Sequence, residues 1–217
     1  LPVKAGGRYF YTHNTGLQNQ SPLYVRKGLR GKPRLLIDPN GWAQDQATAL
    51  DNWKPSDDGK LLLYSVQDGG SDWRTLKVLE VASGKPLADE VRWAKFTQLA
   101  WVGSEGFLYS RFPAPEEGQD YQQPNYNHAI WYHRIGTSQD ADRLVYATPG
   151  HPDRNHVAEV TSDGRMAVIA SSIGTDARYE VHVVDLGKRN RATGERTWPV
   201  RELVSGFDND WQLVEGM

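Results

Sequence analysis

Short apolar runs alternate with polar turns along the whole chain, and one arrangement of the two recurs four times. In each copy a glycine-containing turn leads into an apolar or aromatic strand, which a second strand follows. The copies read Lys4-Ala5-Gly6-Gly7-Arg8-Tyr9-Phe10-Tyr11, Ser56-Asp57-Asp58-Gly59-Lys60-Leu61-Leu62-Leu63-Tyr64, Gly103-Ser104-Glu105-Gly106-Phe107-Leu108-Tyr109 and Thr161-Ser162-Asp163-Gly164-Arg165-Met166-Ala167-Val168-Ile169. Residues 75–81 alternate apolar and polar side chains, as a half-buried strand requires. No apolar stripe of helical period extends beyond two turns, so the pattern predicts an all-β fold.

The spacing of the repeat predicts the architecture. The glycines at positions 7, 59, 106 and 164 are 52, 47 and 58 residues apart, and a strand-built period near 50 residues is typical of propeller blades. We expect blades, each a short antiparallel sheet, over residues 7–50, 51–101, 102–150 and 151–206, with residues 207–217 beginning the next. Because four blades and a fragment cannot close a ring, we expect the chain to be a piece of a longer polypeptide.

One irregular stretch, residues 113–126, is polar and interrupted by prolines. This composition predicts a loop between the first and second strands of the third blade. The loop is either a solvated connection or a flap at a domain edge.

Composition limits the possible partners. The 217 residues are 38% hydrophobic, with 8 Trp, 10 Tyr and 5 Phe to supply large buried surfaces, and the formal net charge of −2 favours neither nucleic acid nor an anionic membrane. No stretch approaches 18 apolar residues, so we expect no membrane partner. Cysteine is absent, which excludes disulfides and thiolate chemistry. The compartment stays open between cytoplasm and bacterial periplasm.

Catalytic signatures are missing from the sequence. It contains no Gly-x-Ser-x-Gly elbow, no His-Glu-x-x-His, no Walker loop and no Gly-x-Gly-x-x-Gly. The six histidines are scattered, and the two pairs spaced by five residues fall on opposite faces of a strand. We therefore predict no catalytic residue, no cofactor and no metal site within the chain.

Several longer motifs, in order, resemble the propeller of the prolyl oligopeptidase family. They are residues 9–23 with 36–40, Gly70-Ser71-Asp72-Trp73-Arg74-Thr75, Lys95-Phe96-Thr97-Gln98-Leu99-Ala100-Trp101, Gly106-Phe107-Leu108-Tyr109-Ser110-Arg111-Phe112-Pro113 and Ile130-Trp131-Tyr132-His133-Arg134-Ile135-Gly136-Thr137-Ser138-Gln139-Asp140. Together they span most of residues 7–186.

The resemblance implies the first four blades of a seven-bladed propeller that caps an α/β-hydrolase domain of the same polypeptide. Such enzymes carry a Ser-Asp-His triad after the propeller and cleave short peptides on the carboxyl side of proline. The implied partners are thus a proline-containing oligopeptide and the hydrolase domain, and the implied role of the propeller is to exclude folded proteins and to form part of the substrate pocket.

The resemblance also implies site residues. Phe96 matches an aromatic that lines the pocket for the residue upstream of proline; the alternative is a core phenylalanine on an inner strand. Asp72 matches an acidic position at the domain interface; the alternative is an aspartate that caps its own turn. Two further substrate-binding positions fall at Asn155 and near Thr175, where polar or neutral residues replace the family's apolar or charged ones.

Two other functions stay open at this stage. The chain could belong to a non-catalytic propeller that binds a peptide or protein. It could also belong to an enzyme like oligopeptidase B, which shares the architecture and cleaves after basic residues.

Overall fold

The computed structural model describes residues 1–42, 48–69, 71–116, 125–174 and 176–209. The chain divides into two compact units, one made of residues 1–92 with 136–139 and the other of residues 93–135 with 140 onward. Two short 3₁₀ helices, η1 (Pro39–Gly41) and η2 (Gln139–Ala141), join strands that otherwise dominate the described residues. No helix among the described residues is long and apolar enough to cross a membrane.

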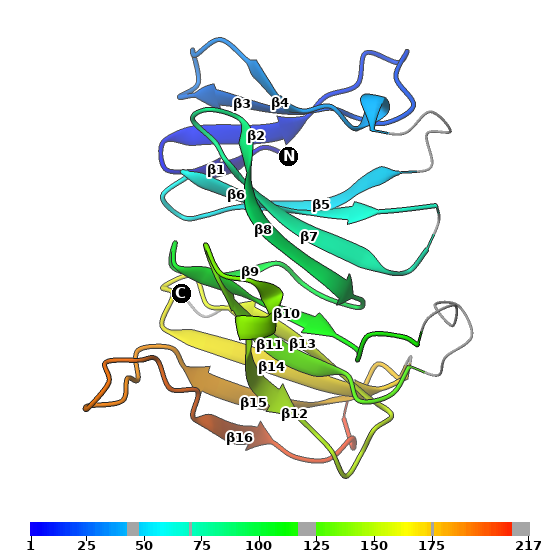
Figure 1. The fold of residues 1–217 in the computed structure, drawn as a ribbon, viewed down its shortest axis with the longest axis vertical. Helices are drawn as coiled ribbons and strands as arrows, with labels where there is room; N and C mark the ends of the chain where they lie inside the picture. The colour runs from blue at the N-terminus through cyan, green and yellow to red at the C-terminus, as the bar shows by residue number, and fades with distance from the viewer. Residues whose placement is uncertain (43–47, 70, 117–124, 175, 210–217) are drawn as a thin grey trace. The chain divides into compact units, whose positions relative to one another are not determined.

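The first unit contains two antiparallel four-stranded arrays (Figure 1). The first array consists of β1 (Val3–Ala5), β2 (Arg8–Thr12), β3 (Leu23–Lys27) and β4 (Arg34–Ile37). The second consists of β5 (Ala49–Pro55), β6 (Leu61–Gln67), β7 (Arg74–Glu80) and β8 (Lys85–Ala94), whose last two residues belong to the second unit. Each strand pairs with the next along the chain, as in a propeller blade.

The second unit repeats this order twice. The third array consists of β9 (Ala100–Val102), β10 (Gly106–Arg111), β11 (Ala129–Arg134) and β12 (Arg143–Ala147). Because Arg111 of β10 pairs with Ala94, the last residue of β8, strands β5 to β12 form one eight-stranded sheet. The fourth consists of β13 (Arg154–Val160), β14 (Met166–Ile173), β15 (Tyr179–Asp185) and β16 (Val200–Val204). The prediction of an all-β fold built from short antiparallel sheets is confirmed.

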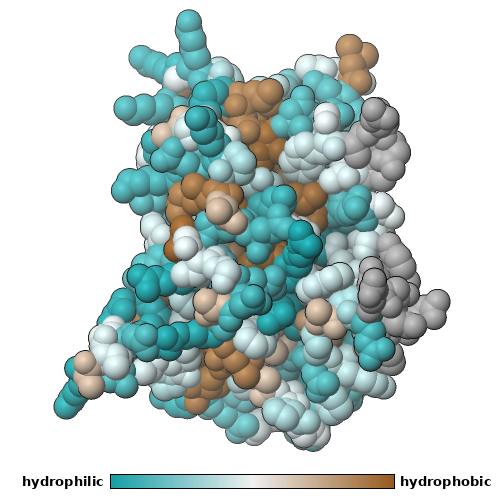
Figure 2. Space-filling model, in the orientation of Figure 1, coloured by the Kyte–Doolittle hydropathy of each residue, from teal (hydrophilic) through white to brown (hydrophobic). Residues whose placement is uncertain are grey.

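Within each unit, two sheets bury one continuous apolar cluster. In the first unit the cluster is Ala5, Phe10, Leu23, Val25, Leu36, Ile37, Leu62, Tyr64, Leu79 and Val81. In the second it is Ala100, Val102, Leu108, Ile130, Tyr132, Val145, Ala158, Ala167, Ile169, Val184 and Leu186. Because each cluster draws on two successive sheets, a single sheet would leave its apolar face in water. On the face drawn in Figure 2, hydrophilic side chains predominate and hydrophobic ones form separate patches.

The recurring glycine turn is built from the same hydrogen bonds in two of the sheets. In the β5–β6 turn the Ser56 hydroxyl contacts the Asp58 carboxylate at 2.7 Å and accepts from the first amide of β6 at 3.0 Å. Thr161 and Asp163 repeat this arrangement in the β13–β14 turn, at 2.6 Å and 3.1 Å. Such side-chain bonds to the local backbone explain why Ser/Thr-x-Asp-Gly specifies the reversal.

Two sequence interpretations need correction. The glycine turn does not open each repeat, because a first strand precedes it: β1 before Gly6 and β9 before Gly103. The described part of residues 113–126 accordingly connects the second and third strands of its sheet, β10 and β11, and not the first and second. Residues 117–124 of that stretch, and most of the expected start of a further blade at 207–217, lie outside the described residues.

Candidate functional site

Phe96 lies in a short connection, the Phe96 loop (residues 95–99), between the end of β8 and the start of β9. Its backbone has φ +50°, in the left-handed region, and its side chain is 52% exposed. Phe96 is therefore neither on a strand nor in the core, which excludes the core alternative. A bulky residue in this conformation costs about 1–2 kcal/mol, so its surroundings must hold it there.

Ser110 of β10 holds the residues on both sides of Phe96. The Lys95 amide donates to the Ser110 carbonyl at 3.4 Å, and the Ser110 amide donates to the Thr97 hydroxyl at 2.8 Å. Just before the loop, Ala94 at the end of β8 pairs with Arg111 of β10. Hydrogen bonds thus attach the loop to β10 on both sides of the strained residue, Phe96.

An aromatic and cationic group surrounds the Phe96 ring. The Phe112 and His128 rings meet it edge to face, with centroids 6.1 Å and 6.5 Å away, and these two rings lie 4.4 Å from each other. The Lys95 ammonium sits 5.4 Å from the Phe96 centroid and bonds to Asn125 at 3.2 Å. One side of the ring is supported by protein while about half of the residue stays accessible, an arrangement suited to an apolar ligand group.

His128 connects the Phe96 loop to β13. Its Nε2 lies 2.9 Å from the Lys95 carbonyl oxygen, and its Nδ1 accepts the backbone N–H of His156 at 2.8 Å. The two histidine rings stack with centroids 6.1 Å apart, and both residues are 1% exposed or less. Burial lowers the pKa of His128 to about 4. Burial, and then the nearby His128, lower the pKa of His156 to about 3. Both rings are therefore neutral near pH 7.

Asn155 directly precedes His156 on β13 and pairs with Ser172 on β14. Alternation along the strand turns its side chain to the face opposite His156, and the residue is half-buried. Phe96 and Asn155 thus belong to one unit and are linked through His128 and the His156 amide. Thr175, the third position expected to bind substrate, lies outside the described residues.

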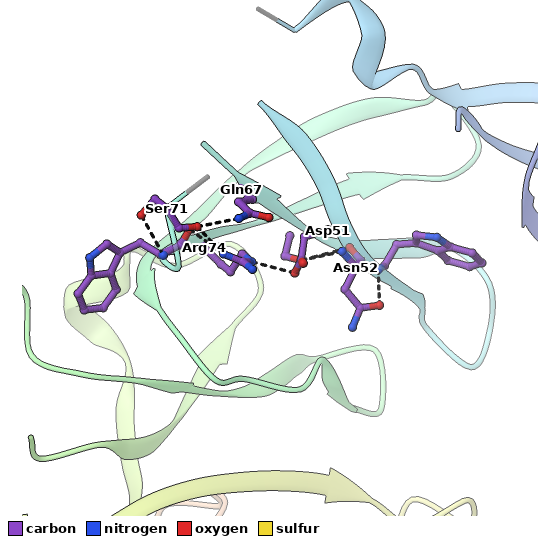
Figure 3. Close-up of polar contacts among 8 residues, drawn as sticks. Asp51, Asn52, Gln67, Ser71 and Arg74 are labelled. Carbon is purple, nitrogen blue, oxygen red and sulfur yellow. Dashed lines mark hydrogen bonds and ion pairs between the residues drawn. The ribbon is translucent and has the colours of Figure 1, made fainter. Parts of the chain in front are cut away.

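Asp72 lies in the first unit, on the connection between β6 and β7, and is exposed. A hydrogen-bonded network joins the two ends of this connection to Ser71 within it and to Asp51 of β5 (Figure 3). Arg74 donates to the Ser71 carbonyl at 2.8 Å and pairs with the Asp51 carboxylate at 3.0 Å, and Gln67 donates to the same carbonyl at 2.9 Å. The network holds the loop in place while leaving Asp72 at the surface.

Asp51 reaches Arg74 because β5 contains a bulge. The pairing with β6 shifts between Leu50 and Asn52, which leaves Asp51 without a cross-strand partner position. Its carboxylate accepts from the Ser65 hydroxyl at 3.0 Å as well as from Arg74. A bulge commonly redirects one side chain out of the alternating pattern, and here it directs a carboxylate toward the loop of Asp72.

A His–Asp pair occurs in the core of the third sheet. His133 Nδ1 lies 2.7 Å from Asp142, whose second oxygen accepts from the Tyr109 hydroxyl at 2.6 Å. The side chains of His133 and Asp142 are 0% exposed, so this network cannot reach a substrate. It satisfies buried polar groups within one sheet.

A separate cavity of about 270 Å³ lies near the β9–β10 turn and does not include the Phe96 loop in its lining. Its charged lining is mutually paired: Glu105 contacts Arg189 and Arg196 at 3.3 Å and 3.2 Å, and Glu195 contacts Arg143 at 2.8 Å. Among the described residues, no group of three or more His, Cys, Asp or Glu is placed to hold a metal ion.

The sequence suggested Phe96 as a candidate site residue but gave no indication of the histidines that hold its loop. His128 and His156 are 28 residues apart, and neither lies in a recognisable motif. The signal that could have indicated them was their position at the start of the third strand of one repeat and in the first strand of the next.

Arrays of four antiparallel strands that follow one another in chain order, and pack in pairs within each unit, are the arrangement of a β-propeller segment. Residues 1–216 match the model of the prolyl oligopeptidase N-terminal β-propeller domain. The chain therefore belongs to the prolyl oligopeptidase family.

Relatives of known name agree with this assignment. A prolyl endopeptidase of Elizabethkingia meningoseptica is 32% identical over 214 residues, covering 99% of this chain and 29% of the relative. A structure from a study of two prolyl endopeptidases and their inter-domain dynamics is 50% identical, with a TM-score of 0.87, and matches 100% of this chain and 30% of that one. Prolyl oligopeptidase B from Galerina marginata, bound to a 35-residue hydrolysis and macrocyclization substrate, is 27% identical with a TM-score of 0.86 and coverages of 100% and 32%. The chain thus spans about a third or less of the length of these relatives.

Proposed function

We propose that this chain is the substrate-gating and pocket-contributing propeller segment of a serine peptidase that cleaves short peptides after proline. The observation that carries the proposal is the similarity to a solved prolyl endopeptidase, which extends over the whole chain at 50% identity. The bond chemistry would belong to an α/β-hydrolase domain of the same polypeptide, where a serine forms an acyl-enzyme through an oxyanion intermediate. The propeller would act by exclusion and positioning.

In this proposal Phe96 contacts the substrate residue upstream of proline. Its ring is half exposed, flat and supported from behind by Phe112 and His128. A ring that is already fixed binds an apolar side chain without the entropy cost of ordering a mobile one. Asn155 and Thr175 would contribute polar contacts that modify preference beyond proline.

Asp72 would lie at the interface with the hydrolase domain. It is exposed on a connection that Arg74 and Asp51 hold in place. Replacing Asp72 with Asn keeps the shape and removes the charge; we expect weaker domain closure and a smaller salt dependence of kcat/KM. Asp57→Asn, on an exposed turn of the same sheet, is the matched control.

The test uses the full-length protein and matched peptides with proline or arginine at the cleavage position. Cleavage after proline supports the proposal, and preference for arginine would instead indicate an enzyme like oligopeptidase B. Absence of any hydrolysis, with tight peptide binding, would indicate a non-catalytic propeller. Gating is tested with one prolyl sequence, presented as a free peptide and within a folded protein; equal cleavage of the two would contradict it.

A further inference from the structure

His128 occupies the junction between the two candidate substrate-binding residues of the second unit. On one side it contacts the Phe96 loop twice, through the Lys95 carbonyl at 2.9 Å and through the Phe96 ring. On the other side it accepts the amide of His156, the residue next to Asn155, at 2.8 Å. A single imidazole therefore connects two backbone segments that carry candidate site residues.

The hydrogen bonds determine the state of the ring. A backbone N–H can only donate, so His128 Nδ1 carries no proton. A backbone carbonyl can only accept, so Nε2 carries the proton and donates it to Lys95. This neutral tautomer satisfies both neighbours, whereas a doubly protonated ring would set a second donor against the His156 amide.

We infer that His128 is a positioning residue for substrate selection, which holds the Phe96 ring at a fixed place and orientation relative to the start of β13. The inference rests on the proposed function of Phe96 in contacting the residue upstream of proline. His128 does not itself touch substrate, because it is 1% exposed and lies behind the Phe96 ring.

The strained backbone of Phe96 gives the reason for such a residue. With φ at +50°, the Phe96 loop would relax toward ordinary conformations if its bonds were removed. Ser110 fixes the Lys95 amide and the Thr97 hydroxyl, but the carbonyl that leads into Phe96 is held by His128. Loss of that bond frees the peptide plane on which the φ angle of Phe96 depends.

Two substitutions separate the two bonds of the imidazole. In His128→Asn the amide oxygen takes the place of Nδ1 and still accepts from His156, but the side chain does not reach Lys95. In His128→Gln the amide nitrogen takes the place of Nε2 and still donates to the Lys95 carbonyl. The control is His182→Gln, which alters another buried histidine of the same unit, on β15, whose hydrogen bonds run to Tyr146.

The first measurement is the ratio of kcat/KM for two prolyl peptides in the full-length protein, one with a bulky apolar residue upstream of proline and one with glycine. We expect Phe96→Ala to lower this ratio about tenfold and His128→Asn to lower it about three- to tenfold. His128→Gln should restore most of the ratio, and adding His128→Asn to Phe96→Ala should lower it no further. Equal losses on both peptides, or additive losses, would overturn the inference.

The second measurement, hydrogen exchange of full-length protein without substrate, is independent of activity. His128→Asn should speed exchange of a peptide covering residues 92–99, while His128→Gln and His182→Gln leave it near the wild-type rate. Unchanged exchange in His128→Asn would overturn the inference even if the enzyme cleaves after proline. If exchange and selectivity respond as expected but the bond cleaved does not follow proline, the proposed function fails and the positioning role stands.

Discussion

The glycine turn of the first sheet allows a sharp test of how neighbouring sheets pack within the first unit. Gly6 and Gly7 are adjacent in the β1–β2 turn, and both have positive φ, +52° and +72°. The Gly6 amide donates to the Asp57 carbonyl of the β5–β6 turn at 3.0 Å. A Cβ added to Gly6 would lie 1.8 Å from the Asp58 carbonyl oxygen, whereas one added to Gly7 would meet nothing within 4 Å.

These distances distinguish two contributions to the stability that is lost when alanine replaces either glycine. Both substitutions force a residue with a Cβ into the left-handed region, at about 1 kcal/mol. Gly6→Ala must in addition push apart two backbone segments, which costs about 1–3 kcal/mol, and stretch the bond to Asp57, worth about 1 kcal/mol. We expect a loss near 1 kcal/mol for Gly7→Ala and about 3–5 kcal/mol for Gly6→Ala.

Urea unfolding of the full-length protein, followed by tryptophan fluorescence, measures both variants. Gly7→Ala serves as the control because it shares the strain and lacks the collision. The expected order of midpoints is wild type, then Gly7→Ala slightly lower, then Gly6→Ala far lower or with sharply reduced soluble yield. Equal midpoints for the two variants would refute the reasoning, because the difference depends only on the contact between the two turns.

Three further predictions concern other parts of the molecule. As the pH falls below 6.5, histidines in the unfolded chain take up protons, whereas folded His128 and His156 stay neutral down to about pH 4 and 3, so the free energy of unfolding falls by about 1.4 kcal/mol per pH unit for each group. Urea unfolding between pH 7 and 4.5 should show that the free energy of unfolding depends less steeply on pH in His128→Gln than in the wild type. Parallel pH dependences would contradict this. Arg74→Met should lower the free energy of unfolding by about 1 kcal/mol and speed hydrogen exchange in residues 68–73. Arg74→Lys should give intermediate effects, because it keeps the charge that pairs with Asp51. Unchanged exchange would mean that the network does not hold the loop. The 217-residue chain alone should be hydrolytically inert and prone to associate through open blade faces; a monodisperse, cooperatively melting monomer on size exclusion and calorimetry would disprove the second part.

The strands and turns that carry a strong local pattern could be predicted from the sequence. Ser56 and Thr161 specify their turns through bonds to side chains two residues away, so local sequence is enough. The strand before the glycine turn escaped prediction in every repeat; in two of them, β1 and β9, it has only three residues, which give no readable period. Their place in the sheet is set by pairing with β2 and β10, which is tertiary information.

For the candidate site, the sequence suggested Phe96 as a candidate residue but could not predict its conformation. The Lys95-Phe96-Thr97 motif located the aromatic residue, but nothing in those three residues indicates a left-handed phenylalanine. That conformation depends on Ser110 and His128, which are distant in sequence. The bulge that turns Asp51 toward Arg74 is likewise invisible in sequence, because it arises from a register shift between two strands.

The strain at Phe96 and the proposed function have a common physical basis. A surface phenylalanine on a free loop would sample several rotamers and lose about 0.5–1.5 kcal/mol on binding a ligand. Here about 1–2 kcal/mol of backbone strain is offset in the folded state by the bonds to Ser110 and His128, each worth about 1 kcal/mol. The cost of ordering the ring is therefore met during folding and not during binding. A propeller that adds no bond-breaking chemistry of its own would then still alter substrate choice, because it presents an apolar surface whose position is already fixed.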